Sequence, residues 1–305
     1  MKKTQISNAS LYNEDNLKVM ATMPDESIDV ICIDPPYLYL KNQKLERHFD
    51  EQKFFSECKR LLTKNGFIVM FGRGESFYRW NTILANLGFN FKEEIIWDKR
   101  YVTSPLMRLS RVHETISIFT KGKGSINKVK VPYLEMKGHD IDGVVKDIKQ
   151  LKTTFKNTNS LNAVLEFLDS NKVPTYKEST ESSFINSTIK SQNKCAAVMN
   201  TIQNGLKEKS IIKQCGDRYQ TIHPTQKPIR LLERLLALVI PTDKDRKNIV
   251  VADFFAGSMS TMEAVHNMGM QGIATEIDEG YFEAGKKRIE SLKEKLHTYE
   301  TISNS

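Results

Sequence analysis

The stretch Ile28-Asp29-Val30-Ile31-Cys32-Ile33-Asp34-Pro35-Pro36-Tyr37 decides the fold of this chain. Its first six residues are almost all apolar and β-branched, which predicts a strand buried on both faces of a parallel sheet. The two prolines have no N–H for a neighbouring strand, so the chain must leave the sheet there. Asp34 and Tyr37 are then expected just past the carboxyl end of a central strand, where open α/β sheets bind ligands. The plain alternative is a Pro-Pro turn with a packed tyrosine.

A second predicted strand is followed by a turn rich in small residues. Residues 248–252 form an apolar run that leads into Asp253-Phe254-Phe255-Ala256-Gly257-Ser258-Met259-Ser260-Thr261 and then a helix to residue 268. This layout lets a backbone approach a nucleotide closely. A further strand, 272–275, leads to Glu276, which follows Asp253 by 23 residues and suits bonding to ribose hydroxyls.

The rest of the hydrophobic pattern alternates between helices and strands. The spacing predicts helices over 49–62, 76–87, 229–240 and 281–296, and strands over 67–71, 91–97 and 114–119. Alternation of this kind indicates an α/β fold with a largely parallel sheet. With 305 residues, the chain is long enough for one large or two smaller domains.

Residues 122–216 differ in character from the rest of the chain. Asn, Ser, Thr and Lys dominate there, and only helical patterns remain, over 141–155, 161–168 and 185–206. The net charge of +8 is concentrated in this part, because residues 121–220 hold 17 Lys and Arg against 10 Asp and Glu. Such a block is either a solvated surface or a surface that contacts nucleic-acid phosphates.

The composition excludes several classes of protein. Hydrophobic residues make up 39% of the chain, and no apolar run approaches the roughly 20 residues that a membrane span needs. The four cysteines form no C-x-x-C pair, so neither a zinc site nor a disulfide framework is predicted. The amino-terminal residues lack the apolar core of a signal peptide. We therefore expect a cytoplasmic protein with no metal site and no membrane partner.

Asp34-Pro35-Pro36-Tyr37 resembles the catalytic motif of S-adenosylmethionine-dependent amino-methyltransferases, which act on adenine-N6 or, usually with Ser in place of Asp, on cytosine-N4. The phrase His223-Pro224-Thr225-Gln226-Lys227-Pro228 and the turn at 253–261 resemble further motifs of that family. The catalytic motif precedes the insert and the cofactor motif follows it, which is the order of the beta class.

The resemblance covers residues 11–121 and 222–292 and implies a Rossmann-like α/β methyltransferase sheet. The catalytic domain would comprise residues 1–121 and 217–305. Residues 122–216 would be an inserted, partly helical target-recognition region.

The resemblance also implies roles for individual residues. The catalytic set would be Asp34, Pro35, Pro36 and Tyr37: the Asp34 carboxylate and the rigid Pro35 carbonyl would accept the two hydrogens of an exocyclic amine. Tyr37 would stack the flipped base, a contact worth roughly 1–3 kcal/mol, against a flipping cost of a few kcal/mol. The residues expected to bind S-adenosyl-L-methionine are Asp15, Asp34, Thr225, Lys227, Asp253, Phe255, Gly257, Ser258 and Glu276.

Two positions depart from the family turn Asp-Pro-Phe-x-Gly-Ser-Gly-Thr. Phe254 replaces the Pro and Met259 replaces the second Gly. A Met brings a long side chain to a place where Gly allows positive φ or close approach. It either crowds the cofactor or, through a shifted turn, packs away from it under the following helix.

Aspartate before the prolines favours adenine over cytosine, and the expected function is site-specific DNA adenine-N6 methylation. A cytosine-N4 or RNA methyltransferase is the alternative among enzymes. A DNA-binding partner subunit without activity is the alternative from another class. Double-stranded DNA is the expected partner, and a homodimer and a cognate restriction endonuclease remain open.

Overall fold

The computed structural model describes residues 2–37, 47–100, 108–132, 135–136, 204–216, 222–223 and 226–303, with single positions at 145, 162, 165–166 and 169. The chain forms two compact units. One comprises residues 1–127 and 209–305, and the other comprises residues 128–208. The helices predicted at 141–155 and 161–168 lie outside the described residues apart from those isolated positions. Of the helix predicted at 185–206 only residues 204–206 are described, and Leu206 belongs to a strand instead of a helix.

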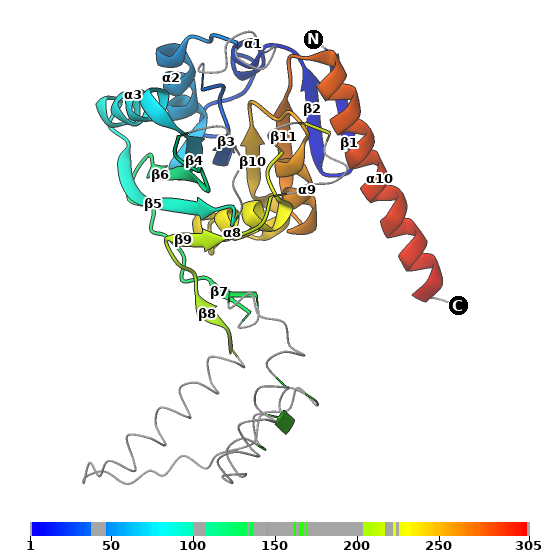
Figure 1. The fold of residues 1–305 in the computed structure, drawn as a ribbon. Coiled ribbons are helices and arrows are strands. Elements are labelled where there is room, and N and C mark those ends of the chain that lie inside the picture. Colours follow the sequence, from blue (N-terminus) through cyan, green and yellow to red (C-terminus); the bar gives the residue numbers. More distant parts are fainter. Residues whose placement is uncertain are drawn as a thin grey trace, which may run out of the picture. The chain divides into compact units, whose positions relative to one another are not determined.

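The first unit is built on a nine-stranded sheet with the strand order β1-β2-β11-β10-β3-β4-β6-β5-β9 (Figure 1). Its strands are β1 Lys2–Ile6, β2 Ala9–Asn13, β3 Ile28–Ile33, β4 Leu62–Gly72, β5 Asn90–Asp98, β6 His113–Thr120, β9 Ile211–Lys213, β10 Val250–Asp253 and β11 Gln271–Thr275. The five strands from β2 to β4 are mutually parallel, and β6 runs antiparallel to both β4 and β5. This sheet confirms the predicted α/β fold.

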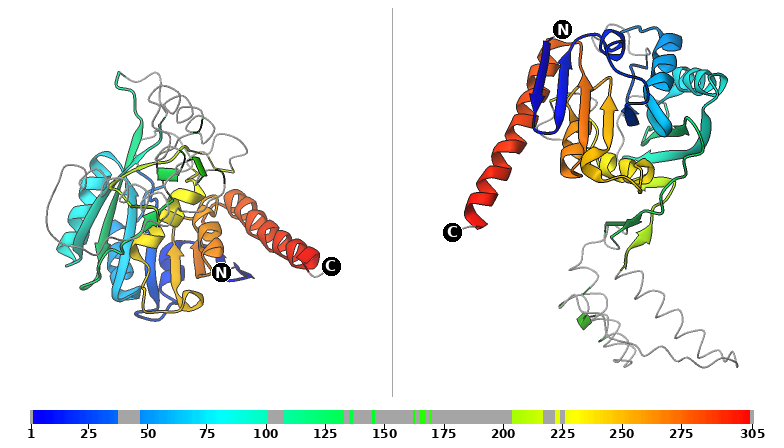
Figure 2. Two further views of the ribbon diagram at one scale, coloured as in Figure 1. Left: turned by 90° about the horizontal axis from the view of Figure 1, so that it is seen from below. Right: turned by 180° about the vertical axis from the view of Figure 1, so that it is seen from behind.

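Helices pack in two groups against this sheet (Figure 2). The first group is α1 Asn16–Met20, α2 Glu51–Leu61 and α3 Gly74–Asn86, and the second is α8 Ile229–Val239, α9 Ser260–Asn267 and α10 Glu279–Ser303. The helices and strands predicted in both parts of this unit are present, with ends shifted by a few residues.

The strand β3 lies at the centre of the sheet and is buried at all six positions. Ile31 and Ile33 join the apolar cluster formed by α2 and α3. Because side chains alternate along a strand, Val30 and Cys32 face the opposite side, which α8 covers. Burial on both faces explains the continuous apolar run in the sequence.

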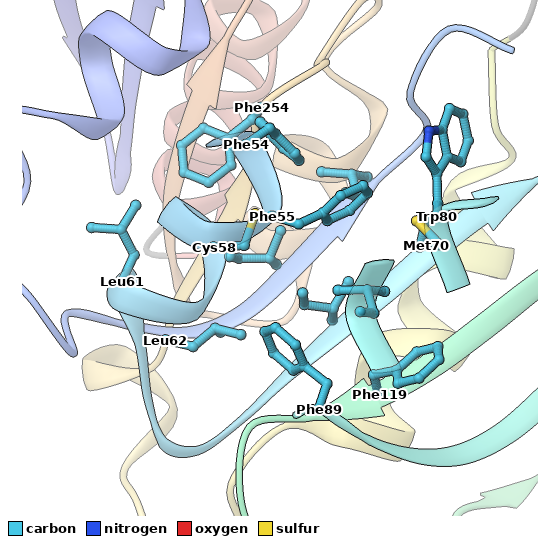
Figure 3. Close-up of a cluster of buried hydrophobic side chains, with 14 of the residues drawn as sticks. Phe54, Phe55, Cys58, Leu61, Leu62, Met70, Trp80, Phe89, Phe119 and Phe254 are labelled. Carbon is cyan, nitrogen blue, oxygen red and sulfur yellow. The ribbon is translucent and has the colours of Figure 1, made fainter. Parts of the chain in front are cut away.

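Aromatic rings fill much of the core between α2, α3 and the sheet (Figure 3). Phe54 contacts Phe55 edge to face at 5.3 Å between ring centroids and also contacts Phe254 at 6.2 Å. Phe254, which stands where the family turn has Pro, is therefore a core residue and only 2% exposed. Its ring joins the cofactor turn to α2.

The boundary between the units differs from the predicted insert of 122–216. β9 adds to the nine-stranded sheet beside β5, so residues 209–216 belong to the first unit. Asn127 also belongs there, because its side-chain amide donates to the carbonyls of Ala237 and Ile240 at the end of α8. The second unit contains a two-stranded antiparallel ribbon of β7 Lys130–Val131 and β8 Leu206–Lys207.

Candidate active site

A cavity of about 230 Å³ lies at the carboxyl edge of the sheet, beside the ends of β2, β3, β10 and β11. Parallel strands all end at this edge, which is why distant segments of the chain meet here. Its acidic lining residues are Glu14, Asp15, Asp34, Glu114, Glu276 and Asp278. The basic side chains on its wall are Arg47, His48, His223 and Lys227, and Phe49, Phe255 and Tyr281 supply rings.

The Asp34-Pro35-Pro36-Tyr37 motif follows β3 directly and lines this cavity. The Tyr37 hydroxyl donates to Asp34 Oδ1 at 2.5 Å, so a hydrogen bond joins the first and last residues of the motif. The Ser76 hydroxyl on α3 donates to the Tyr37 carbonyl at 2.7 Å. The Tyr37 ring also packs against Trp80, 6.1 Å between centroids. The loop that carries Asp34 is thereby held from two sides.

Lys227 reaches Asp34 from the segment that precedes α8. Its ammonium donates to Asp34 Oδ2 and lies 3.2 Å from Glu114 Oε2, close enough for an ion pair although the angle does not fit a hydrogen bond. Glu114 pairs in turn with Lys99 through its other oxygen. Four alternating charges, which we term the charge ladder (Asp34, Lys227, Glu114, Lys99), therefore run from β3 across the ends of β6 and β5.

The charge ladder shifts the pKa values of its buried members. Burial is the largest single influence on Lys227 and by itself lowers the pKa, but Asp34 and Glu114 outweigh it and leave the pKa raised. Burial likewise acts to raise the pKa of Glu114, while Lys227 and Lys99 together bring it below its ordinary value. Both side chains are thus held in their charged forms despite being buried.

Glu276 directly follows β11 and faces the same cavity. Its two carboxylate oxygens accept the backbone N–H groups of Gly257 and Asp278, each at 2.8 Å. Burial raises the pKa of Glu276, although these two hydrogen bonds act in the opposite direction. Gly257 has φ +48°, a left-handed conformation that favours glycine, and this turns its N–H toward the acid.

Asp253 at the end of β10 organises the turn from inside. Its oxygens accept the Phe255 N–H at 3.0 Å and the Thr261 hydroxyl at 2.6 Å. Burial raises the pKa of Asp253 to about 7, against the lowering effect of those two bonds. Asp253 and Ser258 line a second, smaller cavity of about 60 Å³, which also reaches Asp34.

Met259 adopts φ +60°, the left-handed conformation that Gly would take at this position. Its side chain is fully buried and lines neither of the two cavities. It packs against Gly285 of α10, where even a Cβ atom would approach Met259 Cβ to 3.2 Å. Of the two outcomes considered for this Met, the side chain takes the one that leaves the cavity clear, and the helix it contacts is α10.

Most residues predicted for the site come together at this edge. Asp15, Asp34, Pro35, Pro36, Tyr37, Lys227, Phe255, Gly257 and Glu276 line the larger cavity. Asp253 and Ser258 line only the smaller one. Thr225 lies outside the described residues.

Sequence reasoning missed several residues at the site. Glu114 and Lys99 are half of the charge ladder, yet each stands at the end of an ordinary strand pattern. His223 packs on Tyr281 of α10 with ring centroids 4.4 Å apart, and burial lowers the pKa of its imidazole. An acid at the start of an apolar strand, as in His113-Glu114, was the one available signal for Glu114.

The charges of the larger cavity fit a cationic cofactor. Six carboxylic side chains line it against two strongly basic ones, Lys227 and Arg47. A sulfonium ion with an attached adenosyl group would find acids around it and the rings of Phe49 and Phe255 beside it. A phosphate-bearing cofactor would meet repulsion at the same place. Among the described residues, no group of three or more His, Cys, Asp or Glu is placed to hold a metal ion.

Comparison with known proteins identifies the family of this chain. The family model described as DNA methylase, of the N6/N4 amino type, matches residues 28–287. The type II methyltransferase M.HinfI of Haemophilus influenzae is 25% identical over 96% of this chain and 72% of its own length. The M1.HpyAVI–SAM complex has a similar fold, with a TM-score of 0.54 at 18% identity, covering 92% of this chain and 99% of that one. The cytosine-N4-specific PvuII DNA methyltransferase has a TM-score of 0.57 at 16% identity, covering 92% and 86%.

The chain belongs to the N6/N4 family of DNA methylases. It is an S-adenosylmethionine-dependent DNA amino-methyltransferase with a Rossmann-like sheet, as the resemblance implied. In the part of the chain that the structure describes, no helix is both long and apolar enough to cross a membrane.

Proposed function

We propose that this chain is a site-specific DNA adenine-N6 methyltransferase. The observation that carries the proposal is the Asp34 carboxylate at the cavity wall, with one oxygen bonded to Tyr37 and the other paired with Lys227. Each carboxylate oxygen has a second lone pair, so Asp34 retains acceptor capacity for a substrate amine. The family form with Asp before Pro-Pro favours adenine.

The chain's own residues perform a simple task in this reaction. An exocyclic amine is a poor nucleophile because its lone pair is delocalised into the ring. Asp34 and the Pro35 carbonyl accept its two hydrogens and so localise the lone pair on nitrogen. Bound S-adenosylmethionine would supply the methyl group. As the new N–C bond forms, the methyl–sulfur bond would break and leave a neutral thioether, and the proton lost by the amine would pass to solvent, so no covalent link to the protein is required.

The remaining site residues have supporting roles in this proposal. Tyr37 presents its ring to a base that has been flipped out of the duplex, at a cost of a few kcal/mol. Phe255, Gly257 and Glu276 form the cofactor side of the cavity, and Asp253 shapes the turn that carries them. Asp15, Ser258 and Thr225 stay expected cofactor residues. The second unit would recognise the DNA sequence, and a homodimer and an endonuclease partner stay predictions.

Cytosine-N4 methylation is the second candidate, because a cytosine-N4-specific enzyme is among the similar folds. Both amines have the same chemistry, and a pocket of this size does not by itself select one. A catalytically silent subunit is disfavoured, since Met259 leaves the cavity clear and the Asp34 motif is complete.

The test is to incubate the purified protein with S-adenosylmethionine and double-stranded DNA and to digest the product to nucleosides. Mass spectrometry should find N6-methyladenine, and single-molecule sequencing of the same DNA should place it at one recurring sequence. N4-methylcytosine in its place would transfer the assignment to cytosine. Methylation of RNA alone, or of neither nucleic acid, would overturn the proposal.

A further inference from the structure

Lys227 is an unusual lysine. Its ammonium is a compact, strongly hydrated charge that normally stays in water, yet this residue is only 7% exposed. Burying a charge is costly unless it is paired well, and removing one partner of a buried pair is more costly still. Burial of this lysine is therefore tolerated because its ammonium is paired, and one of its partners is the Asp34 carboxylate.

The surroundings of Lys227 fix the ammonium as well as pair it. Behind it, Glu114 lies 3.2 Å away and is itself held by Lys99. The ammonium also lies 4.9 Å from the centre of the Phe71 ring and 6.0 Å from that of Trp97. A cation over aromatic faces is attracted to them. A flexible side chain thereby becomes a rigid donor aimed at Asp34.

Asp34 needs such a donor for geometric reasons. The terminal torsion of an aspartate is broad and roughly two-fold, so a free carboxylate swings between orientations. Tyr37 fixes Oδ1 and Lys227 fixes Oδ2, which together set the plane of the carboxylate and the direction of its remaining lone pairs. Small errors in the placement of a reacting group cost rate steeply.

We infer that the main role of Lys227 is to position Asp34, with Glu114 and Lys99 holding it in place, and not to bind the cofactor. This inference rests on the proposed function, since it concerns how the acid receives the target amine. It departs from the cofactor role expected for Lys227 from the sequence. The two roles differ in what they change: positioning affects the transfer step, and cofactor contact affects cofactor affinity.

The chain offers a matched control in Lys244. That residue pairs with Asp29 at 2.6 Å, and Asp29 lies near the opposite end of the same strand, β3. Lys244→Met also removes a lysine–aspartate pair of β3 without approaching the cavity, although the Lys244 side chain is 36% exposed and that of Lys227 only 8%. Any general effect of losing such a pair on the sheet should appear in both variants.

The experiment measures two quantities on full-length protein: the single-turnover rate of methyl transfer to DNA at saturating cofactor, and the dissociation constant of S-adenosylmethionine by calorimetry. For Lys227→Met we expect a rate at least ten-fold lower and a dissociation constant within three-fold of the wild type. Lys244→Met should leave both quantities unchanged. Glu114→Gln should lower the rate less than Lys227→Met, because Lys227 would still reach Asp34.

Lys227→Met leaves Glu114 with one partner fewer and could lower the yield of folded protein. The double variant Lys227→Met/Glu114→Gln removes one charge of each sign, so one acid (Asp34) and one base (Lys99) remain and the net charge of the charge ladder is unchanged. It should bind cofactor normally and show the same rate loss as Lys227→Met, since both changes act through Asp34. A ten-fold weaker cofactor affinity with an unchanged rate, or no change in either quantity, would overturn the inference. Failure of the wild type to methylate DNA would instead refute the proposed function.

Discussion

Met259 and Gly285 pack directly against each other, the first at the start of α9 and the second within α10. The Met side chain fills the space above Gly285 that any larger residue would need. Arg288, one turn further along α10, binds the Ser258 carbonyl at 3.2 Å and the Ser260 hydroxyl at 3.1 Å. The turn that carries Gly257 and Ser258 is thereby clamped to α10.

The first prediction concerns Met259→Gly. Gly relieves the left-handed backbone by about 1 kcal/mol, but it empties a buried site, which for large-to-small changes costs about 2–5 kcal/mol. We expect a net loss of roughly 1–4 kcal/mol and a Tm lower by several degrees. Cofactor affinity should change less than three-fold. Tighter cofactor binding with an unchanged Tm would mean that Met259 crowds the site after all.

The second prediction compares the two acids at the ends of β3. Asp34→Asn keeps the shape of the side chain but removes the charge that receives the amine, so methyl transfer should fall on the order of 10²–10³-fold. The fold should persist, because Lys227 retains Glu114. Asp29→Asn should instead lower stability and leave activity unchanged. The Asp29 carboxylate accepts hydrogen bonds from the Lys244 ammonium and the Val250 N–H, so weakening them lowers the melting temperature without changing the transfer rate of the folded protein. Equal activity loss in both would contradict the assignment.

The third prediction uses the pKa of Asp253, raised by burial to about 7 from 3.8. The folded state then holds a proton that the unfolded state has released, so this group lowers stability as pH rises from about 4 to 7. Asp253→Asn removes that dependence. The variant should gain a few kcal/mol over the wild type at pH 8 and little at pH 4. Urea unfolding without cofactor at both pH values measures this, and a variant less stable at pH 8 would refute it.

The fourth prediction concerns DNA binding by the second unit. Lys130 of β7 and Lys207 of β8 are directly opposed in the ribbon, and Lys128 is exposed nearby in sequence. Opposed like charges destabilise a strand pair unless a polyanion neutralises them. Replacing these three by Gln should flatten the slope of log affinity against log salt by up to about 2–3, since each phosphate contact contributes about 0.9.

Lys121 is the control for that measurement. It belongs to the same basic block, but its ammonium is engaged by Glu26 at 3.0 Å and by the Leu62 carbonyl at 2.8 Å. Lys121→Gln should therefore leave the salt slope unchanged. Lys123 is exposed but belongs to the first unit, so its contribution to DNA phosphate contacts is expected to be smaller. An unchanged slope in the triple variant would place the phosphate contacts elsewhere.

The sequence was sufficient where a feature depends on neighbouring residues. The apolar run of β3 predicts burial on both faces, and the two prolines after it force the chain out of the sheet beside Asp34. An apolar run followed by small residues likewise predicts the strand, turn and helix around Asp253. These patterns predicted the α/β fold and the place of Asp34, Tyr37 and Glu276 at the carboxyl edge of the sheet.

Tertiary structure alone decided which side chains meet. Lys227 follows Asp34 by 193 residues, and no periodicity could indicate that it would pair with Asp34 and have Glu114 and Lys99 behind it. The place of Met259 likewise depended on Gly285, a residue of another helix. A hydrophobic pattern tells which face of an element is buried but not which element covers it. A buried ion pair exists only where folding removes water from both partners at once.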